Sequence, residues 1–144
     1  MNASSMMITD LASVAPCDTI QDAVDAIEAA GTSSVPVVDK KQRLVGILSE
    51  RDVIAAALPE YIQMLHDAGF MPNLHGLTKG LKRIAGHPVE KYMSREVITV
   101  HDDEQDLQVA ALMLRHKLRL LPVVDDDGKL IGIIRRVDLF KHVL

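Results

Sequence analysis

The sequence is poor in aromatic side chains. Among its 144 residues there is no tryptophan, and there are only two tyrosines and two phenylalanines. A packed core must therefore be built from Val, Ile, Leu, Ala and Met. Few rings are available to stack on nucleic-acid bases, and the net charge of −4 gives no general attraction to phosphate backbones or anionic membranes. Binding to nucleic acids or to membranes is therefore not expected.

Cysteine is almost absent as well. Cys17 is the single cysteine, so no disulfide can form within the chain, and a reducing compartment is the simpler interpretation. No apolar run approaches the roughly 20 residues that span a bilayer. Residues 1–7 lack the basic start and the long apolar stretch of a secretory signal. We therefore expect a cytoplasmic protein.

The short motifs of common catalytic and metal sites are also missing. The six histidines form no His-x-x-x-His pair and no pairing with cysteine at the spacing of metal ligands. There is no glycine-rich phosphate loop and no Gly-x-Ser-x-Gly motif. Cys17 has no histidine close to it in the sequence, which favours a structural role. We expect no enzyme activity, no catalytic residues, no metal and no catalytic cofactor.

What the sequence does contain is an internal repeat. The runs VPVVD and LVGIL, at 35–39 and 44–48, recur as LPVVD and LIGII at 121–125 and 130–134. The register is strict, since each residue of the first copy, such as Asp52, lies 86 positions before its counterpart, here Asp138. Two copies predict a pseudo-symmetric pair rather than a long solenoid.

Each copy predicts the same order of elements. A short extended segment is followed by an amphipathic helix, for which Thr19 and Asp22 suggest a capping box at its start and Gly31 an end. Two β-branched strands joined by a hairpin come next, and a second helix follows. Gly46 in the middle of a strand indicates that another backbone or a ligand approaches it closely. The fold class is therefore α+β, with two β-α-β-β-α repeats and a three-stranded sheet in each.

A segment without a counterpart separates the two copies. We divide the chain into repeat 1 (1–58), a helical linker or insertion (59–88) and repeat 2 (89–144). Within the insertion the pattern predicts a helix over 59–66, a loop over 69–78 and a short basic helix over 79–85. Most insertions of this kind are connections, so we interpret it as a linker lying over the module.

With these residues assembled, the chain resembles a tandem pair of cystathionine-β-synthase (CBS) domains, the Bateman module. The doubled (V/L)-P-V-V-D and (V/I)-G-I runs carry the resemblance, together with the Ser-Glu-Arg-Asp signature at 49–52 and the Val-Glu-Lys-Tyr-Met run at 89–93. The match covers nearly the whole chain except 59–87. It implies a stand-alone CBS-domain protein in which the sheets of the two repeats pack face to face with the helices outside.

The resemblance also implies a regulatory function. Members of the family bind AMP, ADP, ATP, S-adenosylmethionine or related adenosyl ligands in two clefts between the paired repeats. The family often assembles as flat discs, so we expect a homodimer formed through the helix faces and, in addition, a regulated protein partner.

For the first cleft, the resemblance implies that Asp52 takes the ribose hydroxyls and Ser49 touches phosphate. These residues would face a group from repeat 2, namely Ile98, Thr99, Arg119 and Leu120. Further candidates to bind the phosphate are Arg51, Lys117 and His116. Spacing alone leaves a second interpretation open, because Ser-x-x-Asp at a helix start is also the pattern of a helix cap.

For the second cleft, Asp138 would face residues of repeat 1, namely Ala12, Ser13, Ser33, Ser34 and Val35. Here the sequence departs from the family pattern, because Arg135 replaces the expected Ser or Thr. Its guanidinium could hold a phosphate as a bidentate donor, or its bulk could occlude the cleft. The sequence therefore favours the first cleft. An alternative function, a ligand-independent dimerisation or scaffolding module with vestigial clefts, stays open.

Overall fold

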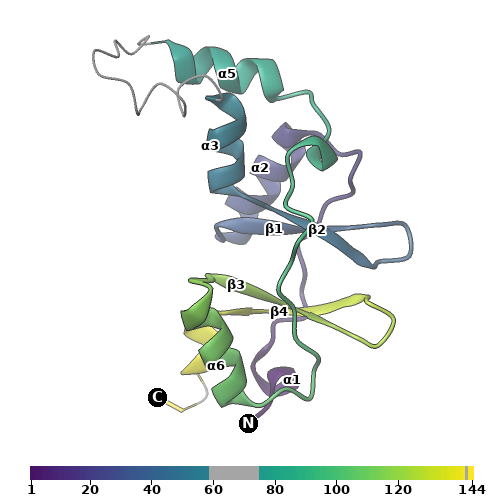
Figure 1. Cartoon of the computed structure of the whole chain (residues 1–144), viewed down its shortest axis with the longest axis vertical. Helices are drawn as coiled ribbons and strands as arrows, with labels where there is room; N and C mark the ends of the chain where they lie inside the picture. The colour runs from purple at the N-terminus through teal and green to yellow at the C-terminus, as the bar shows by residue number, and fades with distance from the viewer. Residues whose placement is uncertain (59–74, 142) are drawn as a thin grey trace.

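Two small sheets lie face to face in the middle of the molecule, and the helices lie outside them (Figure 1). The computed structural model describes residues 1–58, 75–141 and 143–144. In repeat 1, β1 (Ser34–Val38) pairs antiparallel with β2 (Leu44–Ser49). In repeat 2, β3 (Leu120–Val124) pairs with β4 (Leu130–Arg135) in the equivalent register. The α+β fold of two pseudo-symmetric repeats, expected from the sequence, is confirmed.

The sheets have two strands each, so the expectation of three-stranded sheets is wrong in detail. The extended segment that opens each repeat makes a single parallel bridge, Val14 to Val37 in repeat 1 and Val100 to Val123 in repeat 2. In repeat 1 the pairing cannot extend beyond Val14. Val14 donates to the Pro36 carbonyl and accepts from the Val38 N–H, so residue 16 would supply the next N–H of this parallel ladder, and Pro16 has none.

The first helix of each repeat forms where the pattern predicts it. Helix α2 (Ile20–Ala30) begins with the Thr19–Asp22 capping box and ends at Gly31, whose φ of 66° is the left-handed conformation that glycine adopts without strain. Helix α6 (Asp106–Arg115) is its counterpart in repeat 2. Alternate residues of β1 and the inner face of α2 enclose the core of repeat 1.

The second helix differs between the repeats. Helix α3 (Glu50–Ala57) is a regular α-helix, whereas its counterpart η2 (Arg136–Leu139) is a short 3₁₀ turn. The expectation of a second helix is therefore confirmed in repeat 1, whereas in repeat 2 it is reduced to this turn. Short helices depend on tertiary packing for their stability, and α3 receives that packing from a helix of the insertion, α5.

Helix α5 (Gly76–Ile84) joins the insertion to repeat 1. It begins within 69–78, which the sequence predicts as a loop, so that prediction is wrong for residues 76–78. Ile84 is fully buried in the core of repeat 1, and Gly80 lies against the backbone of Ala57 in α3. The predicted helix at 59–66 lies outside the described residues. The described part of the insertion thus packs as an element of repeat 1.

The opening segments cross between the repeats. The N-terminal helix α1 (Ala3–Met6), which the sequence pattern did not predict, is buried in the core of repeat 2, whereas Met93, which follows the 3₁₀ turn η1 (Val89–Lys91), is buried in that of repeat 1. The mid-strand glycine at 46 makes room for this crossing, as the sequence indicated. A Cβ there would lie 2.6 Å from the Met93 sulfur and 2.9 Å from the Ser94 carbonyl oxygen.

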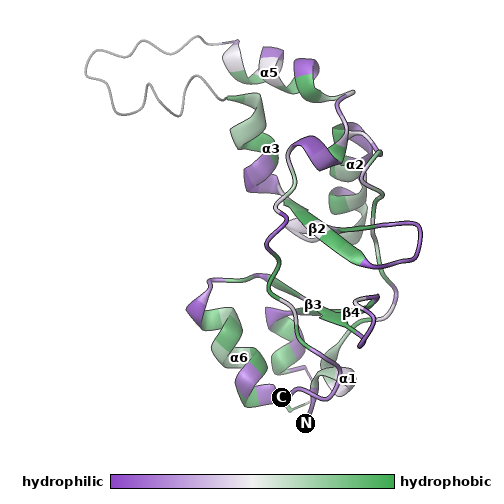
Figure 2. Cartoon of the chain, turned by 45° about the vertical axis from the view of Figure 1, so that its right-hand side comes forward, coloured by the Kyte–Doolittle hydropathy of each residue, from purple (hydrophilic) through white to green (hydrophobic). Residues whose placement is uncertain are grey.

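The two hairpin turns are also joined. The Leu44 N–H donates to the Gly128 carbonyl at 2.9 Å, and the Leu130 N–H donates to the Gln42 carbonyl at 3.0 Å. Together with the crossed opening segments, these bonds hold the two repeats at a fixed distance. Hydropathy is distributed as expected for such a pair, with apolar strands and mixed helix surfaces (Figure 2). In the described part of the chain no helix has the length and apolar character needed to cross a membrane.

Candidate functional site

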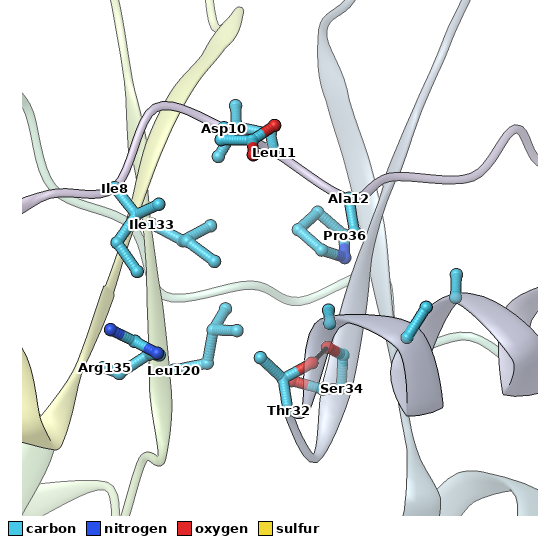
Figure 3. A pocket seen from close by; sticks show the side chains of 13 residues that line it. Ile8, Asp10, Leu11, Ala12, Thr32, Ser34, Pro36, Leu120, Ile133 and Arg135 are labelled. Carbon is cyan, nitrogen blue, oxygen red and sulfur yellow. Dashed lines mark hydrogen bonds between the residues drawn. The ribbon is translucent and has the colours of Figure 1, made fainter.

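A hollow of about 440 Å³ opens between the repeats, and we call it the inner hollow (Figure 3). Repeat 1 supplies one wall. In β1 successive side chains alternate, so that Ser34 and Pro36 face the hollow while Val35 and Val37 enter the core. Three alanines of α2 complete this wall, namely Ala26, Ala29 and Ala30. Their spacing places them on one helix face, and their small side chains leave space between the helix and the sheet.

Repeat 2 supplies the opposite wall. Leu120 of β3, and Ile133 and Arg135 of β4, lie across the hollow from Pro36 and Ser34, and Ile8 lies beside Ile133 (Figure 3). The chain that links the repeats passes over the top and contributes residues 10–12. Apolar and polar groups therefore both line the hollow, and Arg135 and Asp10 are its charged residues. Its volume lies within the roughly 300–1,000 Å³ of small-molecule sites.

Arg135 is tied to Asp138. Its Nε and Nη2 donate to the two carboxylate oxygens at 3.1 and 3.0 Å, and its backbone N–H donates to the same carboxylate at 2.8 Å. Asp138 is 1% exposed. Burial alone would raise its pKa, but the hydrogen bonds and the charge of Arg135 outweigh burial and lower it. The hydrogen bond to Asp138 in turn raises the pKa of Arg135. Asp138 is therefore an ionised carboxylate with both oxygens engaged.

The equivalent pair of repeat 1 forms a helix cap. The Asp52 carboxylate accepts from the Ser49 N–H at 2.9 Å, and the Ser49 hydroxyl accepts from the Asp52 N–H at 3.1 Å. The capping interpretation of this motif is therefore correct. It does not exclude a ligand, because both side chains are only partly buried and a carboxylate accepts more than one hydrogen bond.

The structure brings some of the predicted ligand residues together. Four of them line the inner hollow: Ala12, Ser34, Leu120 and Arg135. Leu120 and Arg135 also line an adjoining hollow of about 420 Å³, the outer hollow, where they meet Ser33 and Arg119. Leu120 and Arg119, which the sequence analysis assigned to the first cleft, therefore lie with residues of the second cleft around Arg135, the cleft that the sequence favours less.

Other predicted residues lie elsewhere. Val35 is buried in the core of repeat 1, and Ile98 packs against that of repeat 2. Ser13 lines a separate hollow beside Cys17, and Thr99 lines another next to Val124. The exposed side chain of Arg51 follows the cap of α3.

Sequence reasoning missed several lining residues. The alanines at 26, 29 and 30 carried a signal, because the offset of 86 matches them with larger side chains, namely Leu112, Arg115 and His116. This difference shows why the two clefts cannot be alike. Pro36 could have been predicted, because it lies two residues after Ser34 in the same strand and therefore on the same face. Ile8 had no such signal, since its place depends on the crossing of the opening segments.

A scan against protein-family models finds the CBS domain twice, at residues 3–59 and 89–144. The chain belongs to the CBS domain family. The two matched segments coincide with the two structural repeats, so the molecule is a tandem CBS pair. Among the described residues, no group of three or more His, Cys, Asp or Glu side chains is placed to hold a metal ion.

Curated relatives support the same family. The CBS pair is 30% identical over 140 residues to inosine-5'-monophosphate dehydrogenase of Methanocaldococcus jannaschii, covering 97% of this chain and 23% of that protein. It is 30% identical over 139 residues to the chloroplastic CBS domain-containing protein CBSX2 of Arabidopsis thaliana, covering 91% of this chain and 58% of the relative. The chain thus spans about a quarter to three fifths of these two relatives.

Solved structures share the fold. CBSX2 in complex with AMP superposes with a TM-score of 0.74 at 29% identity, covering 98% of this chain and 94% of the other. Protein MJ1225 of Methanocaldococcus jannaschii reaches a TM-score of 0.81 at 24% identity, covering 99% of this chain and 48% of its own. The second likeness shows the fold alone, whereas the first also shows a CBS pair that holds an adenine nucleotide.

Proposed function

We propose that this CBS pair is a regulatory module that binds an adenine nucleotide or another adenosyl ligand between its repeats. The observation that carries the proposal is the inner hollow, which is walled by both repeats and has the size of a small-molecule site. Its apolar alanine wall suits a purine ring, and Arg135 suits a phosphate. The AMP complex of CBSX2 supports the same ligand class.

Because each wall comes from a different repeat, a ligand in the hollow contacts both at once. It therefore favours whichever arrangement of the repeats fits it best, and this difference in affinity is what a partner protein senses. The role is regulatory and needs no catalytic residue. We further propose a homodimer, because α6 and η2 expose apolar side chains, among them Leu107, Leu114, Val137 and Phe140.

Calorimetric titration with AMP, ADP, ATP, S-adenosylmethionine and NAD tests the proposal. At least one of these ligands should bind saturably. Ala29→Leu should abolish binding on the Arg135 side, because the larger side chain fills the inner hollow from an exposed helix position where it does not disturb the core. Gln21→Leu, at an exposed position of α2 outside the hollow, is the matched control and should bind like the wild type.

Asp52→Ala examines the other cleft. If Asp52 holds the ribose hydroxyls, Asp52→Ala should lose ligand binding in the cleft beside Asp52, whereas Ala29→Leu should still bind ligand in that cleft. Unchanged affinity and unchanged stoichiometry in Asp52→Ala would show that this assignment is wrong. Circular dichroism of each variant separates a lost ligand contact from a lost helix cap.

A ligand-independent dimerisation module is the second candidate. The bidentate Arg135–Asp138 pair favours it, because both carboxylate oxygens are already satisfied within the protein. If none of the five ligands binds and the protein is dimeric in light scattering, this second function is the correct one.

A further inference from the structure

The inner hollow does not end at Arg135. Thr32, Leu120 and Arg135 line both the inner and the outer hollow, so the two spaces share a boundary and adjoin. The inner one is walled by three alanines of α2 and also contains Asp10, whereas the outer one adds Arg119 and Arg136 from two separate segments of repeat 2. Together they form one cleft, whose arginines gather at its outer end.

Charge in the outer hollow is unbalanced. Three arginines line it, and Glu50 is the acidic residue that lines it with them. Asp138, which lies outside this lining, pairs with Arg135. The Arg136 Nε donates to the Leu118 carbonyl at 2.8 Å, which engages one of its five N–H groups and fixes the direction of the guanidinium. The Arg119 side chain is exposed beside it.

We infer that this cleft takes an adenine nucleotide with a chain of phosphates, ATP or ADP, in preference to AMP, adenosine or S-adenosylmethionine. This inference rests on the function proposed above. The nucleoside occupies the inner hollow, the first phosphate reaches Arg135, and the following phosphates extend to Arg119 and Arg136. Guanidinium groups bind phosphate oxygens in a bidentate manner, so each further phosphate gains charge-assisted hydrogen bonds.

The other ligands use less of the cleft. Adenosine fills the inner hollow only, and the single phosphate of AMP stops at Arg135, whose guanidinium already serves Asp138. S-adenosylmethionine would bring a positive sulfonium towards the arginines and would be repelled. The number of phosphates, rather than the base, is therefore what distinguishes these ligands.

Titration of the wild type with adenosine, AMP, ADP and ATP, in one buffer at one salt concentration, tests the inference. ATP should bind at least about tenfold more tightly than AMP, since a hydrogen bond to a charged group contributes a factor of this order. Inorganic tripolyphosphate should compete with ATP. Raising the salt concentration should weaken ATP binding more than adenosine binding.

Arg119→Gln is the decisive variant, because its side chain is exposed and lies outside both cores. It should weaken ATP binding about tenfold and leave AMP and adenosine unchanged. Lys41→Gln removes one positive charge from the exposed β1–β2 turn, at the opposite end of the strands, and should leave ATP binding unchanged.

Equal affinity for AMP and ATP in the wild type would overturn this inference and leave the proposed function intact. So would an equal loss of ATP binding in Arg119→Gln and Lys41→Gln, because the effect would then be one of overall charge. If no adenine compound binds at all, the proposed function fails together with the inference.

Discussion

At the scale of single residues, the departure of Arg135 from the family pattern has a structural consequence. In repeat 1 the hydroxyl of Ser49, at the equivalent position, caps a helix. In repeat 2 the guanidinium of Arg135 instead donates two hydrogen bonds to the Asp138 carboxylate. The result is a buried carboxylate whose charge is balanced by a cation that is one third exposed. Such an arrangement makes stability depend on pH.

The direction of that dependence follows from the lowered pKa of Asp138. A carboxylate whose folded pKa lies below its unfolded value of about 3.9 contributes stability that is fully present above the unfolded pKa and is lost as the pH falls through the folded pKa. Asp138→Asn should therefore flatten the fall in unfolding free energy between about pH 5 and pH 2, measured by urea denaturation. At pH 7 it should cost about 1–3 kcal/mol.

Asp126→Asn is the control for that experiment. Asp126 lies fully exposed in the β3–β4 turn, so the substitution should change the unfolding free energy at pH 7 by less than about 0.5 kcal/mol. The hydrogen bonds from Arg43 also lower the pKa of Asp39, and because Asp39 is present in all three proteins its contribution cancels in the comparison. A pH profile of Asp138→Asn parallel to that of the wild type would contradict the account of the pair.

At the scale of elements, helix α5 distinguishes the two repeats. It packs on α3 through a contact so close that a Cβ added to Gly80 would overlap the Ala57 carbonyl. Backbone atoms cannot move aside as a flexible side chain can, and α3 and α5 would have to separate. Among the described residues, η2 contacts α6 but has no counterpart of α5 beside it. The insertion therefore supports α3, the helix that Ser49 caps and that carries Asp52.

Gly80→Ala should destabilise the protein by about 1–3 kcal/mol, since overpacking a tight contact forces backbone shifts. Gly86→Ala is the matched control. An added Cβ at Gly86 meets nothing within 4 Å, so that variant should be neutral or slightly stabilising. Thermal unfolding followed by circular dichroism compares the two. Equal melting temperatures for the two variants would show that α5 does not pack tightly on α3.

The sequence predicted the elements that depend on local pattern. The Thr19 cap, the end of α2 at Gly31 and the two hairpins could be predicted, because the signals for caps, turns and periodicity lie within a few neighbouring residues. It did not predict α1, since a helix of four residues has almost no periodicity and forms through its burial in repeat 2. It also did not predict that the third strand is reduced to a single bridge in each repeat.

The candidate site was predicted in part for the same reason. Ala12, Ser34, Leu120 and Arg135 do meet between the repeats. The cleft that is open is the one lined by the small side chains of α2. This could not be predicted from the sequence, because side-chain volume shows where space remains only when the relative position of the two repeats is known. The predicted roles of the site residues remain predictions that the proposed variants test.

At the scale of the whole molecule, helix α6 of repeat 2 exposes two large apolar side chains. Leu107 and Leu114 are 78% and 82% exposed on one face of α6, and Phe140 follows η2 nearby. The equivalent positions of the first two in repeat 1 are polar, Gln21 and Glu28. Large exposed apolar side chains in proximity favour association, here of two copies.

Leu114→Glu should therefore convert the proposed dimer to a monomer, halving the mass measured by light scattering, while circular dichroism shows that the variant remains folded. Gln108→Glu adds the same charge at an exposed position on the same helix and should remain dimeric. If Leu114→Glu is still dimeric, this face of α6 is not the interface.

A crystal structure of the protein grown with ATP would show whether the space between the repeats holds an adenosyl ligand, as we propose. We expect density for the nucleoside in the inner hollow, against Ala29 and Pro36, with the phosphates extending past Arg135 to Arg119. An empty hollow at a saturating concentration of ATP, or a nucleotide bound away from both clefts, would contradict this proposal.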